Sequence, residues 1–224
     1  MEFSRYQQMI QNVEKLRRIL LPPIFSPTGD YEETEKVFTL AVSFRVLSHA
    51  EVESYLEDRA MSATDQAWKA WIRYGIATRT ALSLIAFSDM EMGSPPETLQ
   101  ARQPSQEKSW NEKIDINSKL KIAITKYNNY IKRNNHGIKE ENILSMLLPI
   151  GIRPEKIDQT LLADLNNFGE SRGLAAHSRS ESAQQGIDPK SEYDKVLNII
   201  ESLAELDNEI DKLFKKPRTQ ILNR

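Results

Sequence analysis

An all-α fold, a helical bundle with additional short helices, is what the 224-residue sequence predicts. Apolar residues recur mostly at spacings of three and four, which is the period of an amphipathic helix. No stretch has the pattern of strand, turn and strand at short regular intervals, and the chain has only eight glycines. Together these observations favour helices packed around a shared core.

The chain is expected to form one domain over residues 1–214, followed by a basic tail over residues 215–224. Within this domain, residues 1–29 are expected to form an N-terminal helix and a linker. The first apolar stripe reaches Leu20 and ends before Pro22-Pro23, because proline disfavours helical geometry in the residue that precedes it.

Two longer helices are expected next. The second helix should run from about Tyr31 to Ala60, and Thr64-Asp65 predicts the N-cap of a third. Gly75 within this third helix is expected to mark a kink or a close crossing. The polar residues 92–108 contain three prolines and predict an exposed loop.

The second half of the chain carries further helix signals. A helix from near Trp110 should end at residues 134–137, where Asn and Gly suit a left-handed cap. A short helix is expected over residues 140–148. Arg153-Pro154 predicts the start of the next helix. Asp188-Pro189 predicts the start of the last helix, because it combines a capping acid with proline in the first turn.

Composition excludes several classes of function. The absence of cysteine excludes disulfides, thiolate chemistry and zinc sites built on sulfur. The three histidines stand in separate contexts, so no metal site and no cofactor is expected, and His49 and His136 are expected to be hydrogen-bonded structural residues. A net charge of −2 gives no overall attraction to nucleic acid. The polar N-terminus and the lack of a long apolar run predict a cytoplasmic protein without a membrane partner.

The segment that carries chemistry is residues 170–180. Arg172 can bind a phosphate through its planar fork of donors, and His177 can give and take protons near neutral pH. The five-residue spacing separates the two by roughly 140° around a continuous helix. Both can face one phosphate only if Arg172 reaches around the helix or lies at a bend, which Gly169 and Gly173 would permit.

Each candidate also has an ordinary structural interpretation. Arg172 and His177 could be a solvated pair at a helix end. Ser171, Ser178 and Asn167 could donate hydrogen bonds to RNA, but polar residues near a helix end usually cap or solvate it. Trp68 and Trp71 could stack on bases, although core packing is the more common role. The basic tail could contact phosphates or be a frayed end.

The segment from Leu165 to His177 resembles the signature of HEPN domains, in which an arginine, a short spacer and a histidine end a helix of an α-helical bundle. The form Arg-Gly-x-x-Ala-His resembles the RiboL-PSP-type branch in particular. Residues 48–56 resemble the family's second-helix pattern of small residue, acid and aromatic. Residues 134–139 and 147–152 resemble its central region, so that the resemblance covers most of the chain from about Tyr31 to Leu213.

This resemblance implies a metal-independent endoribonuclease that acts as a homodimer, with two motifs facing one cleft. His177 would activate the ribose 2′-hydroxyl or protonate the leaving oxygen, and Arg172 would bind the scissile phosphate. Glu53 matches the family's acidic position best and would orient Arg172 or His177. The alternative role for Glu53 is a salt bridge or a solvated acid. Glu51 is the weaker candidate for the acidic position. Many such proteins act in toxin–antitoxin or anti-phage systems, which implies an antitoxin or defence partner.

One position departs from the family pattern. Many HEPN ribonucleases have a polar residue directly after the arginine, where this chain has Gly173. That role is therefore unfilled or supplied elsewhere. A second hypothesis is a non-catalytic HEPN module that binds a nucleotide, RNA or a partner protein. A third is a helical interaction module without a site.

Overall fold

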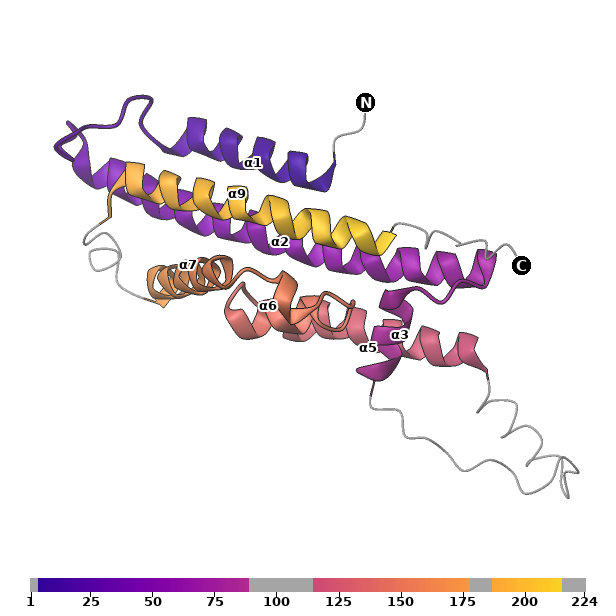
Figure 1. Ribbon diagram of the computed structural model, residues 1–224. Helices are drawn as coiled ribbons and strands as arrows, with labels where there is room; N and C mark the ends of the chain where they lie inside the picture. The colour runs from indigo at the N-terminus through magenta and orange to yellow at the C-terminus, as the bar shows by residue number, and fades with distance from the viewer. Residues whose placement is uncertain (1–3, 89–114, 178–186, 215–224) are drawn as a thin grey trace, which may run out of the picture.

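The computed structural model describes residues 4–88, 115–177 and 187–214, with residues 174–177 as backbone only. Within these ranges the chain forms seven α-helices and one 3-10 helix, and no strand. The helices are α1 (Arg5–Leu20), α2 (Thr34–Tyr74), α3 (Arg79–Ala86), α5 (Ile116–Asn134), α6 (Glu140–Leu147), η1 (Pro154–Lys156), α7 (Gln159–His177) and α9 (Pro189–Phe214). The predicted all-α fold is confirmed (Figure 1).

Helix α2 is the centre of the bundle. It is 41 residues long, and α1 and α9 lie along it, while α7, α6 and α5 cover another side (Figure 1). Each of these helices contributes fully buried apolar side chains to one core. Members of that core include Met9, Val13, Phe44, Leu56, Ile131, Met146, Leu165, Val196 and Leu203. Packing of these apolar faces supplies most of the stability of such helices.

Local sequence signals place three predicted helix ends correctly. Ser4 caps α1 in a capping box with Gln7, and α1 ends at Leu20, ahead of the two prolines. Helix α6 ends at Leu147, close to its predicted end. Helix α9 begins at Pro189, and the Asp188 carboxylate accepts the backbone N–H of Ser191 at 2.8 Å.

The predicted break between a second and a third helix is wrong. Helix α2 continues through Thr64, which is 1% exposed and donates its hydroxyl to the carbonyl of Met61 at 2.8 Å. Residues 61–65 contain no glycine or proline, so burial of this face keeps the helix going. Gly75 is not a kink: it ends α2 at φ 64°, a left-handed conformation that glycine adopts without strain. Helix α3 then begins separately.

Two further expectations are corrected. Arg153-Pro154 begins only η1, and α7 starts after it, with the Asp158 carboxylate accepting the N–H of Leu161 at 2.9 Å. The end of α5 has no left-handed cap, because Asn135 is extended at φ −90°. The predicted loop over residues 92–108, Trp110 and the basic tail lie outside the described residues.

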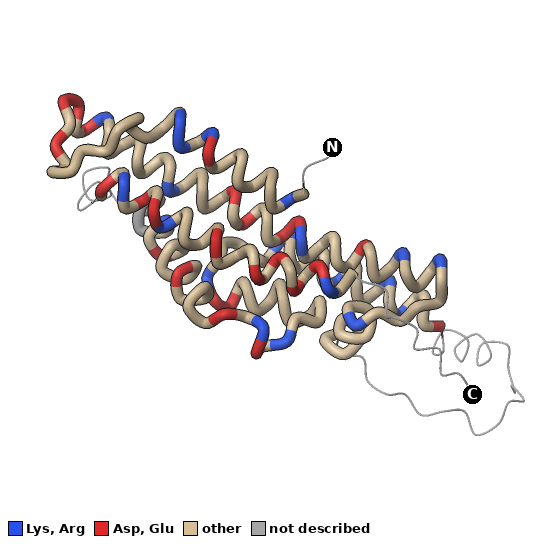
Figure 2. Tube along the Cα trace, turned by 45° about the horizontal axis from the view of Figure 1, so that its top comes forward, with Lys and Arg blue, Asp and Glu red and all other residues tan. Residues whose placement is uncertain are grey.

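The distribution of charge agrees with the sequence. Acidic and basic residues are interspersed along the described helices (Figure 2), and the net charge of the chain is −2. In the described part of the chain, no group of three or more acidic or histidine side chains is placed to hold a metal ion. No helix among the described residues has the length and apolarity needed to cross a membrane.

Candidate functional site

Helix α7 carries the Arg-spacer-His motif near its C-terminal end. It is one continuous helix from Gln159 to His177, so of the two alternatives that the sequence left open, a bend at Gly169 or Gly173 does not occur. Side chains five positions apart on such a helix leave it roughly 140° apart. Arg172 is exposed and forms no ion pair with another described residue, whereas the side chain of His177 lies outside the described residues.

The part of α7 just before Arg172 is packed closely against its neighbours. Phe168, one turn earlier, is 4% exposed, and its ring centre lies 5.6 Å from that of His49 on α2. At Gly169, an added Cβ would meet Lys139 Cγ at 3.3 Å, so α7 passes close to the segment between α5 and α6. These contacts fix the helix that presents Arg172.

Glu53, the acidic residue singled out by the family resemblance, is held by the same segment. One of its carboxylate oxygens accepts the backbone N–H of Gly137, which adopts φ 110°. The other lies 3.6 Å from Nδ1 of His49, one helical turn earlier on α2. No ion pair joins Glu53 to Arg172 in the described part of the chain.

His49 is the residue that sequence reasoning missed. It is 2% exposed, and its Nδ1 has no hydrogen-bond partner among the described residues. Burial lowers the pKa of His49; Glu53 opposes this shift, and the positive charge of Arg172 adds to it. A neutral imidazole therefore lies within electrostatic reach of Arg172. The four-residue spacing between His49 and Glu53 was the available signal.

The other predicted polar residues lie elsewhere on α7 or are already paired. Ser171 donates its hydroxyl to the carbonyl of Asn167 at 2.8 Å, and both line a hollow of about 240 Å³ that Lys195 of α9 also lines. Glu51 forms an ion pair with Arg5 at 2.9 Å, which accounts for its charge. Ser178 lies outside the described residues.

The remaining aromatic and histidine candidates have structural roles. Trp68 and Trp71 pack on a small apolar cluster of Ala67, Ala81 and Leu120. The indole N–H of Trp71 also donates to Asn117 Oδ1 at 2.6 Å. His136 is exposed, and its Nε2 lies 3.0 Å from the carbonyl oxygen of Arg133. This packing favours the structural interpretation of the two tryptophans over base stacking.

Comparison with known proteins identifies the family. The sequence model of the family RiboL-PSP-HEPN matches residues 9–216, which include Glu53, Arg172 and His177. The chain belongs to the RiboL-PSP-HEPN family. The predicted family and branch are thereby confirmed, and the helical bundle is of HEPN type. Neither the comparison with curated proteins nor that with solved structures gives a match.

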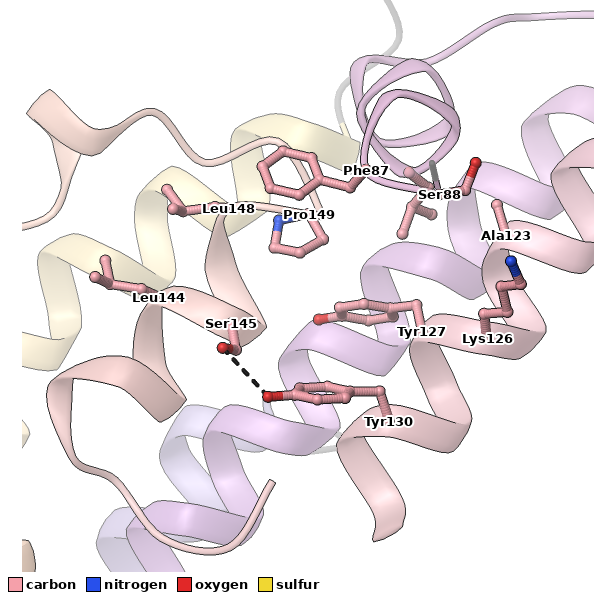
Figure 3. A pocket seen from close by; sticks show the side chains of 11 residues that line it. Phe87, Ser88, Ala123, Lys126, Tyr127, Tyr130, Leu144, Ser145, Leu148 and Pro149 are labelled. Atoms are coloured by element: carbon pink, nitrogen blue, oxygen red, sulfur yellow. Dashed lines mark hydrogen bonds between the residues drawn. The ribbon is translucent and has the colours of Figure 1, made fainter. Parts of the chain in front are cut away.

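The HEPN bundle also contains a separate apolar pocket. It has a volume of about 430 Å³ and lies between α3, α5 and α6 (Figure 3). Tyr127 and Tyr130 line one wall; the Tyr127 hydroxyl donates to the carbonyl of Met146 at 2.6 Å, and that of Tyr130 lies 3.5 Å from Ser145 Oγ. Neither Arg172 nor Glu53 lines this pocket, so it is distinct from the candidate site.

The two glycines of the HEPN motif helix should respond differently to alanine. Gly173 has open space where a Cβ would lie, so Gly173→Ala is expected to stabilise the protein by about 0.5–1 kcal/mol through helix propensity. Gly169→Ala should stabilise the protein less than Gly173→Ala does, or destabilise it, because the added Cβ must displace the side chain of Lys139. Urea unfolding of the two variants measures this. Equal stabilisation of both would contradict the close approach at Gly169.

Proposed function

We propose that this protein is a metal-independent endoribonuclease that acts as a homodimer. Arg172 binds the scissile phosphate and stabilises the charge that develops on it. His177 activates the ribose 2′-hydroxyl in one subunit, and its counterpart in the second subunit protonates the 5′-oxygen as it leaves. The P–O5′ bond breaks as the 2′-oxygen attacks phosphorus, which gives a 2′,3′-cyclic phosphate and a free 5′-hydroxyl.

The exposure of Arg172 is the observation that carries this proposal. Exposed arginines commonly form ion pairs with nearby acids, but Arg172 has none among the described residues, even though α7 is firmly packed one turn earlier. An exposed guanidinium that has no counter-ion among the described residues is available to bind a phosphate. Membership of the RiboL-PSP-HEPN family supports the same role for this arginine.

The continuous helix supports a site shared between two copies. Because positions 172 and 177 lie roughly 140° apart around the continuous helix α7, one motif is poorly arranged to surround a phosphate from both sides. Two motifs facing one cleft would supply an acid and a base in the same step. Glu53 would orient Arg172 or His177. Secondary hydrogen bonds to RNA would come from Asn167, Ser171 and Ser178.

The proposed biological setting follows from the same family resemblance. We expect a cytoplasmic protein that works in a toxin–antitoxin or anti-phage system, with an antitoxin or another defence protein as its partner. Residues 1–214 would act as one domain, without a metal or a cofactor.

The test is RNA cleavage by the full chain in the presence of EDTA, with product ends identified by mass spectrometry. Cyclic phosphate and 5′-hydroxyl ends are expected, together with a dimer in solution by light scattering. Mixed dimers that pair wild-type chains with an Arg172→Ala/His177→Ala chain should lose most activity. Cleavage that requires a divalent metal, or 5′-phosphate products, would refute the proposed mechanism.

Gly173 favours a second function, a non-catalytic HEPN module. It occupies the position after the arginine where many HEPN ribonucleases have a polar residue, and no side chain that the structure describes occupies the space that a Cβ would fill. In this case the protein would bind RNA or a nucleotide through Arg172 without cutting it. RNA binding that is lost in Arg172→Ala but unaffected by His177→Ala, with no cleavage, would favour this function.

A further inference from the structure

A buried histidine of α2 lies against the turn of α7 that precedes Arg172, and a half-buried glutamate of α2 lies next to it. His49 is 2% exposed on α2, with its ring against Phe168 of α7 and its Nδ1 3.6 Å from Glu53. Glu53 is held from the other side by the backbone N–H of Gly137. Three segments, α2, α7 and the connection from α5 to α6, therefore meet at this pair.

Nδ1 of His49 lacks the hydrogen bond that a buried polar atom usually has. No described atom lies within hydrogen-bond distance of His49 Nδ1, and the carboxylate oxygen of Glu53, at 3.6 Å, is just beyond the usual limit of about 3.5 Å. An unpartnered buried nitrogen costs free energy that a purely structural residue would not need to impose. A small movement or a change of protonation would complete the contact.

Two charges act on His49 in the described structure. Glu53, from the same helix, favours the imidazolium form, and Arg172, from α7, disfavours it. The connection from α5 to α6 contributes the neutral amide of Gly137, which is already bonded to Glu53, and the cationic Lys139, whose side-chain stem packs against Gly169 of α7. The charge state of His49 therefore depends on whether the charge of Arg172 is free or neutralised.

We propose that His49 and Glu53 form the inner layer of the phosphate site at Arg172, and that His49 takes up a proton from solvent when a phosphodiester binds there. This inference rests on the proposed function and deepens it. A phosphodiester at Arg172 neutralises the guanidinium and adds a negative charge, and both changes favour the imidazolium. The protonated ring then forms a charge-assisted hydrogen bond to Glu53, and a second positive charge lies beneath the phosphate. His49 is thus a positioning residue, which acts through Glu53 and Arg172.

Linkage fixes the direction of the pH dependence. Burial lowers the pKa of His49 in the free protein, and bound phosphodiester raises it. The complex therefore holds more protons than the free protein between these two pKa values, and binding tightens as pH falls through that window. If the pKa of His49 differs by about one unit between the free protein and the complex, binding below both pKa values is about tenfold tighter than binding above them.

The direct test is an NMR pH titration of the full chain with ¹⁵N-labelled histidine. The probe is a 2′-O-methyl RNA oligonucleotide, which has no free 2′-hydroxyl and so resists cleavage. The three histidines are assigned with His49→Gln, His136→Gln and His177→Gln. The midpoint of His49 is expected to rise by about one pH unit when the probe is bound, and that of His136, which is exposed, to stay unchanged.

Variants separate a positioning role from a structural one. His49→Gln should remove the part of the pH dependence of probe affinity that His49 contributes, because the amide does not titrate, and should leave the part that His177 contributes. His136→Gln is the matched control and should keep the full pH dependence. In Arg172→Gln the rise in the His49 midpoint should disappear. If His49→Gln fails to fold, the NMR titrations of the wild type and of Arg172→Gln still show whether probe binding at Arg172 raises the midpoint of His49.

The outcomes distinguish this inference from the proposed function. RNA cleavage with no change in the His49 midpoint on probe binding would overturn the inference and leave the ribonuclease proposal standing. A raised midpoint in a protein that cuts no RNA would support the inference and favour the non-catalytic module. Absence of probe binding at every pH would overturn both.

Discussion

His177→Ala is expected to slow RNA cleavage by about 10²–10⁴-fold, which is the usual contribution of a positioned general acid or base. The reason is that no other described histidine can take over: His136 is exposed next to Arg133, and His49 is buried. The initial cleavage rate at saturating RNA measures this loss. His136→Ala is the control and should keep wild-type activity.

Arg172→Ala should slow cleavage by about 10²–10³-fold, as the removal of one donor to a transition-state oxyanion does. Because Arg172 is exposed, its substitution should leave the unfolding midpoint nearly unchanged. Arg172→Lys should recover only part of the rate, since an ammonium cannot form a planar two-pronged contact.

Arg153→Ala is the matched control for Arg172→Ala. Arg153 is also exposed, with a side chain 57% accessible, and its nearest acid is Glu155 at 3.8 Å. Its removal should not change the cleavage rate. Equal rates for the wild type and the Arg172→Ala variant would remove Arg172 from the proposed mechanism, and an equal loss in both arginine variants would indicate a general electrostatic effect.

Glu192→Ala is expected to cause a large loss of stability, about 3–5 kcal/mol. Glu192 is 2% exposed on α9, and Arg45 of α2 donates two hydrogen bonds to it, at 2.7 and 2.9 Å. Lys195 donates a third at 2.9 Å. Removal of the carboxylate leaves Arg45, whose side chain is only 13% exposed, without its partner, and an unpaired buried charge is costly.

The urea midpoint measures this effect, with an expected decrease on the order of 1–2 M for a slope of about 2–3 kcal/mol per molar. Asp194→Ala, two positions away on the same helix, is the control. Its pair with Lys190 is exposed on both sides, so the midpoint should change little. A similar midpoint for both variants would show that the buried pair does not stabilise the bundle.

The pH dependence of the same pair has a defined sign. Burial raises the pKa of Glu192, but the hydrogen bonds from Arg45 and Lys195 outweigh it, so that the pKa is lowered overall. A carboxylate with a depressed pKa contributes stability above its unfolded pKa and loses that contribution as pH falls through the folded one. The difference in stability between wild type and Glu192→Ala should therefore shrink under acid conditions, below the ordinary glutamate pKa of about 4.3.

The sequence alone determined the features that depend on neighbouring residues. Pro22-Pro23 and Asp188-Pro189 fixed helix boundaries because proline and capping acids act within one turn. The periodic apolar spacing determined the fold class, and the Arg-spacer-His motif identified a family that the matched residues 9–216 confirm. Each of these signals is local or repeats along the chain.

Tertiary structure decided what depends on contacts between distant segments. Burial carried α2 through Thr64, although threonine and aspartate there suit a helix start, and packing kept α7 straight through two glycines. It also placed His49 of α2 against Phe168 of α7, over one hundred residues later in the chain, so that a histidine expected to be structural lies against α7 one helical turn before Arg172. A pattern of spacing specifies which face of a helix is apolar, but only packing in three dimensions decides which charges meet across that face.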